Sequence, residues 1–307
     1  MPLDADALLD RCRLKRHLAA WRLIGVVALV GLGLLALSKA TGLGERNHIA
    51  RLSITGLITE DRDRDEAVEK LIKDDRVKAL IVRINSPGGT TAGSEALFLQ
   101  LRRASERKPV VATIGTLGAS GGYIVALGAD RVFARETSLT GSIGVLMQTA
   151  EVSGLLDKLG VTSEVLTTGK LKGEPSMVRP LSPEGRTALN ELLQDSYRWF
   201  VGLVKTRRGL AQEEAERLAD GRVFTGRQAI AAKLIDAIGG EREARSWLAK
   251  EHGIAESLPV NDVEIERDDD SWLRSSTSTA LGAFGKVLLP ERLTLDGLMA
   301  LWHPPAN

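Results

Sequence analysis

Cysteine and histidine are scarce in this chain of 307 residues. The single cysteine, Cys12, precedes an apolar N-terminal segment, so the rest of the chain offers no disulfide framework and no cysteine nucleophile. The four histidines are His17, His48, His252 and His303, and no cluster of cysteine and histidine has metal-ligand spacing. We therefore expect no metal and no cofactor. Because the histidines lie at or beyond the ends of the predicted core, a Ser-His-Asp triad is disfavoured.

Neither sign of charge dominates, since 41 basic and 40 acidic residues leave a formal net charge of +1. This balance does not indicate a nucleic-acid partner. Basic residues do cluster before an apolar run at residues 23–37, which predicts a membrane helix whose basic flank stays in the cytoplasm. The run is shorter than the roughly 20 residues of a full span. Snorkelling of Arg22 and Lys39 to the two interfaces would extend it.

The sequence thus predicts a cytoplasmic basic N-terminus at residues 1–22 and a transmembrane signal anchor at residues 23–43. A globular domain is expected at residues 45–250, followed by a C-terminal extension of unknown role at residues 251–307. The alternative for the anchor is a cleaved signal peptide, with SKA at residues 38–40 as the cleavage site. Either way, the chain after about residue 45 lies outside the cytoplasm.

Predicted strands and helices alternate along the domain, which indicates an α/β fold with a largely parallel sheet. The expected strands are residues 49–58, 77–84, 109–115, 131–134 and 163–167. The expected helices are residues 62–74, 92–106, 153–159, 183–207, 213–219 and 226–233. The strand at 77–84 is expected to end in a turn written NSPGG at residues 85–89. Reactive groups in such sheets gather at the carboxyl ends of strands.

The motif ASGGY at residues 119–123 places Ser120 directly after a predicted strand. A free hydroxyl is a poor nucleophile at neutral pH and requires a base. With histidine disfavoured, the remaining candidate is a lysine of lowered pKa, as in a Ser-Lys dyad. The motif GKLKG at residues 169–173 offers Lys170 and Lys172 in a glycine-flanked loop. The residues alone leave both lysines open.

Two glycines are candidate donors to a carbonyl oxygen that becomes negatively charged during amide cleavage: Gly88 and Gly121. Each preset backbone N–H can lower such a barrier by about 3 to 4 kcal/mol, and glycine lets a substrate backbone approach closely. Taken alone, residues 85–89 are equally well an ordinary turn. Ser142, in TGSIGV at residues 140–145, is a candidate to orient the lysine amine, or else a helix cap.

Four motifs in order resemble bacterial signal peptide peptidase A and its relatives: residues 85–89, 119–130, 140–145 and 221–229 (GRVFTGRQA). The resemblance covers about residues 49–240. It implies a membrane serine endopeptidase with a Ser-Lys dyad, built on the Clp protease/crotonase-type superhelical fold of repeated β-β-α units. It further implies degradation of residual signal peptides or other apolar peptides, and a ring-shaped homo-oligomer. The expected location is the bacterial inner membrane, single-pass, with the peptidase domain periplasmic.

The resemblance also assigns roles to individual residues. Ser120 matches the nucleophile, Gly88 and Gly121 match the oxyanion donors, and Ser142 matches the hydroxyl that hydrogen-bonds the lysine amine. Lys172 matches the general base, because the family places its base three residues after the glycine matched here by residue 169.

Two other classes of function remain in view. A crotonase-type acyl-CoA enzyme would use the same fold and oxyanion glycines, but it normally relies on carboxylates and resides in the cytoplasm. A catalytically silent membrane scaffold is the alternative that is not an enzyme. The peptidase interpretation predicts peptide substrates and a membrane as partners, and no nucleic acid.

Overall fold

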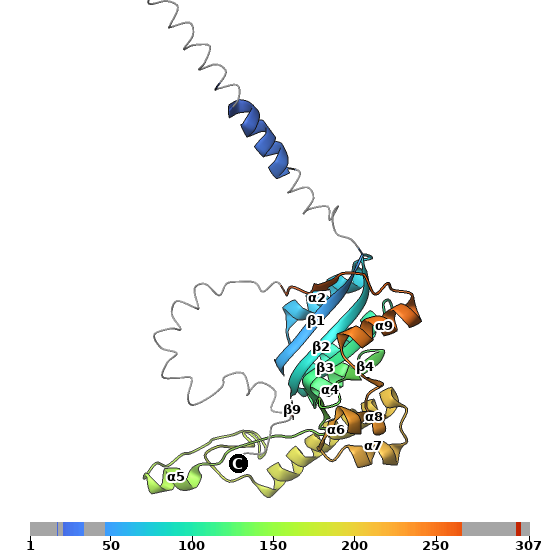
Figure 1. The fold of residues 1–307 in the computed structure, drawn as a ribbon. Coiled ribbons are helices and arrows are strands. Elements are labelled where there is room, and N and C mark those ends of the chain that lie inside the picture. Colours follow the sequence, from blue (N-terminus) through green and yellow to red (C-terminus); the bar gives the residue numbers. More distant parts are fainter. Residues whose placement is uncertain (1–16, 18–20, 34–46, 266–298, 302–307) are drawn as a thin grey trace, which may run out of the picture. The chain divides into compact units, whose positions relative to one another are not determined.

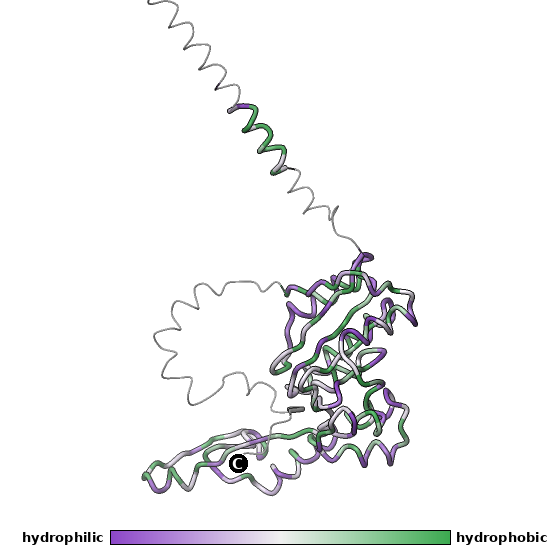
Figure 2. The backbone as a smooth tube through the Cα atoms, in the orientation of Figure 1, coloured by the Kyte–Doolittle hydropathy of each residue, from purple (hydrophilic) through white to green (hydrophobic). Residues whose placement is uncertain are grey.

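The computed structural model describes residues 17, 21–33, 47–265 and 299–301. The chain divides into two units, Met1–Asn47 and His48–Asn307, which we describe separately. In the first unit, residues 21–33 form a mostly apolar helix (Figure 2). No helix within the described residues combines the length and the apolar character that crossing a membrane requires. Residues 34–43 of the predicted anchor, the SKA tripeptide, and residues 266–298 and 302–307 of the predicted extension lie outside the described residues.

The second unit is an α/β domain built on one sheet, which has nine strands among the described residues (Figure 1). The strands are β1 (His48–Ile58), β2 (Val77–Thr90), β3 (Val110–Ala119), β4 (Arg131–Ala134), β5 (Leu139–Gly141), β6 (Val223–Thr225), β7 (Ala237–Ile238), β8 (Val260–Asp262) and β9 (Met299–Leu301). The helices are α2 (Arg62–Lys73), α3 (Thr91–Ser105), α4 (Gly121–Ala126), α5 (Ser153–Lys158), α6 (Pro183–Arg208), α7 (Gln212–Leu218), α8 (Gly226–Ala231) and α9 (Glu241–His252).

The strand order is β6-β5-β3-β2-β1-β8, with β4 added to β3, β7 added to β4, and β9 added to β2. Among the described strands, the pairings β5 with β6 and β2 with β9 are antiparallel, and the others are parallel. The predicted α/β class with a largely parallel sheet is therefore confirmed. The carboxyl ends of β2, β3 and β5 meet at one edge of the sheet, where the predicted site residues begin.

Both faces of the central strands are covered, which explains why β2 begins as a nearly continuous apolar run. Leu80 and Val82 belong to a core formed with residues of α3, α4 and α6. Ala79 and Ile81 point to the opposite face and pack with Leu248 of α9. Successive side chains of a strand alternate between the two faces, so the strand contributes to two cores.

The turn predicted at residues 85–89 is wrong, because β2 continues through this motif to Thr90. The register against β3 shifts between Ile84 and Ser86, and Pro87, which has no N–H to donate, is accommodated beside that irregularity. A Cβ on Gly89 would lie 1.8 Å from the carbonyl oxygen of Ile58. The glycine therefore permits a close approach of β1 rather than a reversal of the chain.

The strand predicted at residues 163–167 is also wrong, since these residues have no regular secondary structure. All residues from 159 to 173 are exposed, so no strand or core of the described part of the chain supports a strand there. At the C-terminal side, the domain boundary predicted at residue 250 falls inside α9. The sheet continues with β8, which pairs with β1.

Candidate active site

Ser120 lies in a sharp turn between β3 and α4, with backbone angles φ 54° and ψ −116°. A positive φ is uncommon for a residue with a side chain and is costly unless the surroundings impose it. Here the Ser120 N–H donates to the carbonyl oxygen of Gly141 at 2.7 Å. The Ser120 carbonyl accepts the N–H groups of Tyr123 and Ile124, each at 2.9 Å. A strained serine at a strand-to-helix turn is the geometry of the nucleophile in many hydrolases.

The Ser120 hydroxyl has no hydrogen-bond partner within the described residues, although the residue is only 1% exposed. Leaving a buried polar group unpaired costs about 1 to 3 kcal/mol. Other buried hydroxyls differ in this respect. Thr140 Oγ1 donates to the carbonyl oxygen of Gly118 at 2.7 Å, whereas Thr91 Oγ1, like Ser120 Oγ, has no partner among the described residues. Ser120 combines such an unpaired hydroxyl with a positive φ.

Gly121 and Gly122 open α4 directly after Ser120. The first N–H groups of a helix have no intrahelical partner, so they are available to a ligand at this end. A Cβ on Gly122 would lie 2.8 Å from the carbonyl oxygen of Ser86. The start of α4 thus packs directly against the end of β2.

Gly88 lies near the end of β2 with φ 116°. Its N–H donates to the Ser86 hydroxyl at 3.1 Å, and that hydroxyl in turn donates to the carbonyl oxygen of Gly56 at 2.6 Å. Ser86 therefore holds the predicted oxyanion donor against β1. No signal in the sequence pointed to this role for Ser86.

Ser142 follows β5 and also has a positive φ, 50°. Its N–H donates to the carbonyl oxygen of Arg222 at 2.8 Å. The preceding residue, Gly141, accepts the N–H of Ser120, so the two serines are joined through one peptide group. No described helix begins at Ser142, and the helix-cap alternative is therefore wrong.

The structure does not place the predicted lysines beside Ser120. Lys170 and Lys172 are exposed and belong to the segment at residues 146–182, which extends away from the sheet and carries α5 (Figure 1). Within the described part of this single chain, Ser120 Oγ forms no hydrogen bond to either amine. The structure thus brings together the predicted serines and glycines and leaves the lysines apart from them.

The turn that carries Lys172 is anchored at one point. Glu174 has a side chain only 6% exposed and forms a 3.7 Å ion pair with Arg179. Its carboxyl group lies over the first turn of α6, since a Cβ on Gly185 would lie 3.0 Å from Glu174 Cδ. The amino end of a helix favours such a negative charge. Glu174 thus anchors the chain to α6 two residues after Lys172, the candidate base.

Comparison with known proteins decides the family. Residues 102–255 match the family model described as peptidase family S49. The chain belongs to this family. A protein of Synechocystis sp. described as a candidate protease is 38% identical over 226 residues, which cover 73% of this chain and 80% of that protein. The chloroplastic serine protease SPPA of Arabidopsis thaliana is 32% identical over 237 residues, which cover 76% of this chain and 34% of that protease.

A solved structure of a mutant of the 1510-N membrane-bound stomatin-specific protease superposes with a TM-score of 0.48 at 14% identity. The superposition covers 72% of this chain and all of that chain. The family match and the identity to the two proteases above, and not this superposition, show that the chain is a serine peptidase of the signal peptide peptidase A family. The alternative of a crotonase-type acyl-CoA enzyme is therefore set aside.

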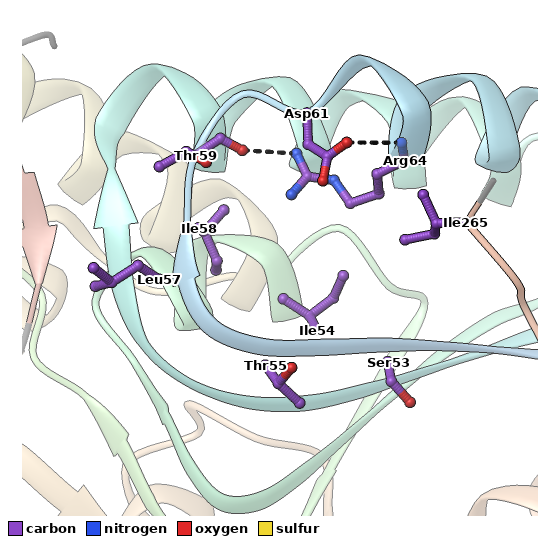
Figure 3. A pocket seen from close by; sticks show the side chains of 9 residues that line it. All are labelled: Ser53, Ile54, Thr55, Leu57, Ile58, Thr59, Asp61, Arg64 and Ile265. Carbon is purple, nitrogen blue, oxygen red and sulfur yellow. Dashed lines mark hydrogen bonds between the residues drawn. The ribbon is translucent and has the colours of Figure 1, made fainter. Parts of the chain in front are cut away.

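This S49 peptidase has a pocket of about 430 Å³ where β1 leads into α2 (Figure 3), and Ser120 is not among its lining residues. Its lining includes Asp61, whose Oδ1 accepts the N–H of Arg64 at 3.0 Å, and Thr59, whose carbonyl accepts Arg64 Nη2 at 3.0 Å. None of the predicted site residues lines this pocket. Among the described residues, no group of three or more His, Cys, Asp or Glu side chains is arranged to hold a metal ion.

Proposed function

We propose that this chain is a membrane-anchored serine endopeptidase that uses Ser120 as nucleophile and Lys172 as general base. Its substrates are residual signal peptides or other apolar peptides at the extracytoplasmic face of the bacterial inner membrane. The observation that carries the proposal is the buried, unpaired Ser120 hydroxyl in a strained turn of an S49 peptidase. We also propose that the α/β domain has the Clp protease/crotonase-type fold.

In the proposed reaction, an extended peptide pairs by its backbone with the end of β2 near Gly88. Lys172, with its amine uncharged, takes the Ser120 proton while Oγ attacks the peptide carbonyl carbon. The N–H groups of Gly88 and Gly121 stabilise the oxyanion. The amine leaves with the proton from Lys172, and water then hydrolyses the acyl-serine ester. For Gly88 to donate, its N–H must be shared with, or released by, the Ser86 hydroxyl.

The lysine would reach the serine through assembly of subunits. The segment that carries Lys172 exposes large apolar side chains that a single chain leaves in water: Leu155, Leu159, Leu166, Leu171 and Met177. Leu166 is 87% exposed. Exposed apolar patches of this kind mark protein contacts. We propose that the segment packs on a neighbouring copy in a ring-shaped homo-oligomer, where Ser142 orients the amine of Lys172.

The proposed anchor draws on the sequence of residues 23–43 and on the helix at residues 21–33, whose apolar side chains are exposed. Basic residues before this helix would remain in the cytoplasm. The peptidase domain would then face the periplasm, with its N-terminus tied to the membrane. Cleavage at residues 38–40 would instead release the domain, and the mass of the mature protein distinguishes the two cases.

A synthetic signal peptide and four proteins test the proposal: the wild type, Ser120→Ala, Lys172→Ala and Lys170→Ala. We expect Ser120→Ala and Lys172→Ala to lose hydrolysis by at least about a thousand-fold, and Lys170→Ala to retain it. A serine-reactive phosphonate should label the wild type and not Ser120→Ala. Mixing Ser120→Ala with Lys172→Ala subunits should restore activity, because each supplies the group that the other lacks.

The outcomes separate the parts of the proposal. Full hydrolysis by Ser120→Ala would contradict the assignment of Ser120 as nucleophile. Full hydrolysis by Lys172→Ala would contradict the assignment of Lys172 as general base. Absence of both labelling and hydrolysis in the wild type favours the membrane scaffold. A lysine base acts only when its amine is uncharged, so activity should also rise toward alkaline pH.

A further inference from the structure

A short strand from the C-terminal end of the chain is added to the end of β2. In β9, Leu301 pairs with Gly88, Ala300 with Gly89 and Met299 with Thr90, in the antiparallel sense. Figure 1 labels β9 at this end of the sheet. The other edge of β2 is occupied at the same level by β1. The end of β2 is therefore paired on both sides.

The edge that β9 occupies becomes available because β3 leaves β2. The last pairing between these two strands joins Ser86 to Gly118. Two residues later the chain enters the Ser120 turn, and α4 follows. Since β9 also lies against α3 and α4, it is close both to the end of β2 and to the helix that begins after Ser120.

The chemistry of this edge suits an extended peptide. A strand edge presents alternating N–H and C=O groups that a second chain can pair with. Here the edge consists of Gly88, Gly89 and Thr90, next to the predicted oxyanion donor. The sequence of β9 is Met-Ala-Leu, which is uncharged and apolar like the proposed substrates.

We infer that residues 299–301 of this chain occupy the edge on which substrate peptides dock, and that they compete with those peptides. The inference rests on the proposed function. It adds that a substrate runs antiparallel to β2, as β9 does, and that it binds only after β9 has left. The tail therefore raises KM and leaves kcat unchanged. If β9 covers the edge nine-tenths of the time, apparent affinity falls about ten-fold.

The test measures peptide binding without turnover. Fluorescence anisotropy of a labelled apolar signal peptide reports binding. The parent is the full-length protein carrying Ser120→Ala, and the first variant is the same protein truncated after residue 297. A second variant carries Ala300→Pro and Leu301→Pro. Neighbouring residues of a strand direct their N–H groups to opposite edges, so one of the two positions faces β2. Because proline has no N–H to donate, the double change weakens the pairing of β9 with β2. The matched control is Ala306→Pro, which lies outside β9.

We expect the truncated and double-proline proteins to bind the peptide about ten-fold more tightly than the parent, and the control to bind like the parent. In the background with Ser120 intact, the same two changes should lower KM about ten-fold with kcat unchanged. Equal affinity in all four proteins overturns the competition by β9 and leaves the peptidase proposal standing. Absence of binding even after truncation overturns the docking edge itself, and with it this part of the proposed function.

Discussion

The N–H of Ser120 donates a 2.7 Å hydrogen bond to the carbonyl oxygen of Gly141. This bond joins the end of β3 to the end of β5, so the sheet itself holds the serine at its positive φ. Ser142, the next residue after Gly141, shares the positive φ. Two strained serines are thus fixed by the same pair of strands, and this strain has measurable consequences for stability.

Replacing Ser120 should increase the free energy of unfolding, and glycine should increase it more than alanine. Ser120→Ala removes the unpaired hydroxyl but keeps a side chain at positive φ, whereas Ser120→Gly removes both. We expect Ser120→Gly to be more stable than Ser120→Ala by about 1 kcal/mol in urea unfolding. At Ser196, in the interior of α6, the order should reverse, because glycine is less favourable than alanine in a helix by about 1 kcal/mol. The same order at both positions would show that Ser120 is unstrained.

Gly122→Ala should impair both folding and activity. Its new Cβ would lie 2.8 Å from the Ser86 carbonyl oxygen, which is a backbone atom and yields little. We expect a loss of about 1 to 3 kcal/mol and a decrease in kcat, since the start of α4 must shift away from β2. Gly202→Ala is the control, because no atom of the described residues outside its own helix and chain neighbours lies within 4 Å of the new Cβ. It should gain up to about 1 kcal/mol. A fully active Gly122→Ala would contradict this packing.

Tyr123 anchors α4 and should govern stability at alkaline pH. Its hydroxyl donates to the Leu234 carbonyl oxygen at 2.7 Å, and complete burial raises the pKa of the phenol. The unfolded chain ionises near pH 10 while the folded one does not, so stability is lost as the pH rises above that value. Tyr123→Phe should cost about 1 to 3 kcal/mol at neutral pH and flatten this alkaline decline. Urea unfolding between pH 7 and 11 measures both effects.

Asp74 should contribute to stability through its carboxylate. Hydrogen bonds from the side chain of Arg76 lower the Asp74 pKa to about 2. The stabilisation is therefore present above the ordinary carboxyl pKa and is lost as the pH falls toward 2. We expect Asp74→Asn to be less stable than the wild type at pH 7, with the difference shrinking toward pH 2. Asp75→Asn, at an exposed neighbouring position, should change stability little at either pH. An unchanged difference across this range would exclude the carboxylate as its source.

The elements predicted correctly are those whose signal is local. The helix α6 is indicated by Ser182 as N-cap and by Pro183 in its first turn, and its apolar side repeats at helical spacing. The strand at residues 77–84 is a continuous apolar run. By contrast, α9 was missed, because it buries little more than Ala244 and Leu248.

The candidate site was predictable where topology alone brings residues together. Ser120 follows β3 and Gly88 lies near the end of the adjacent parallel strand β2, and the carboxyl ends of such strands share an edge. What failed depends on tertiary contacts: the glycines of residues 85–89 allow β1 to approach, and the Ser86 hydroxyl holds Gly88. Val165 and Leu166 have the composition of a strand, yet in a single chain they are exposed, and none of the described strands pairs with them. The choice of Lys172 remains a prediction.

The parting of β2 from β3 after Ser86 and Gly118 gives the sheet a fork. One branch passes through Ser120, the proposed nucleophile, into α4, and the other continues as the proposed docking edge. A change that paired β2 and β3 for one more residue would displace both the proposed nucleophile and the proposed docking edge. The position of the proposed nucleophile and that of the proposed docking edge are therefore both set by the point at which β2 and β3 separate.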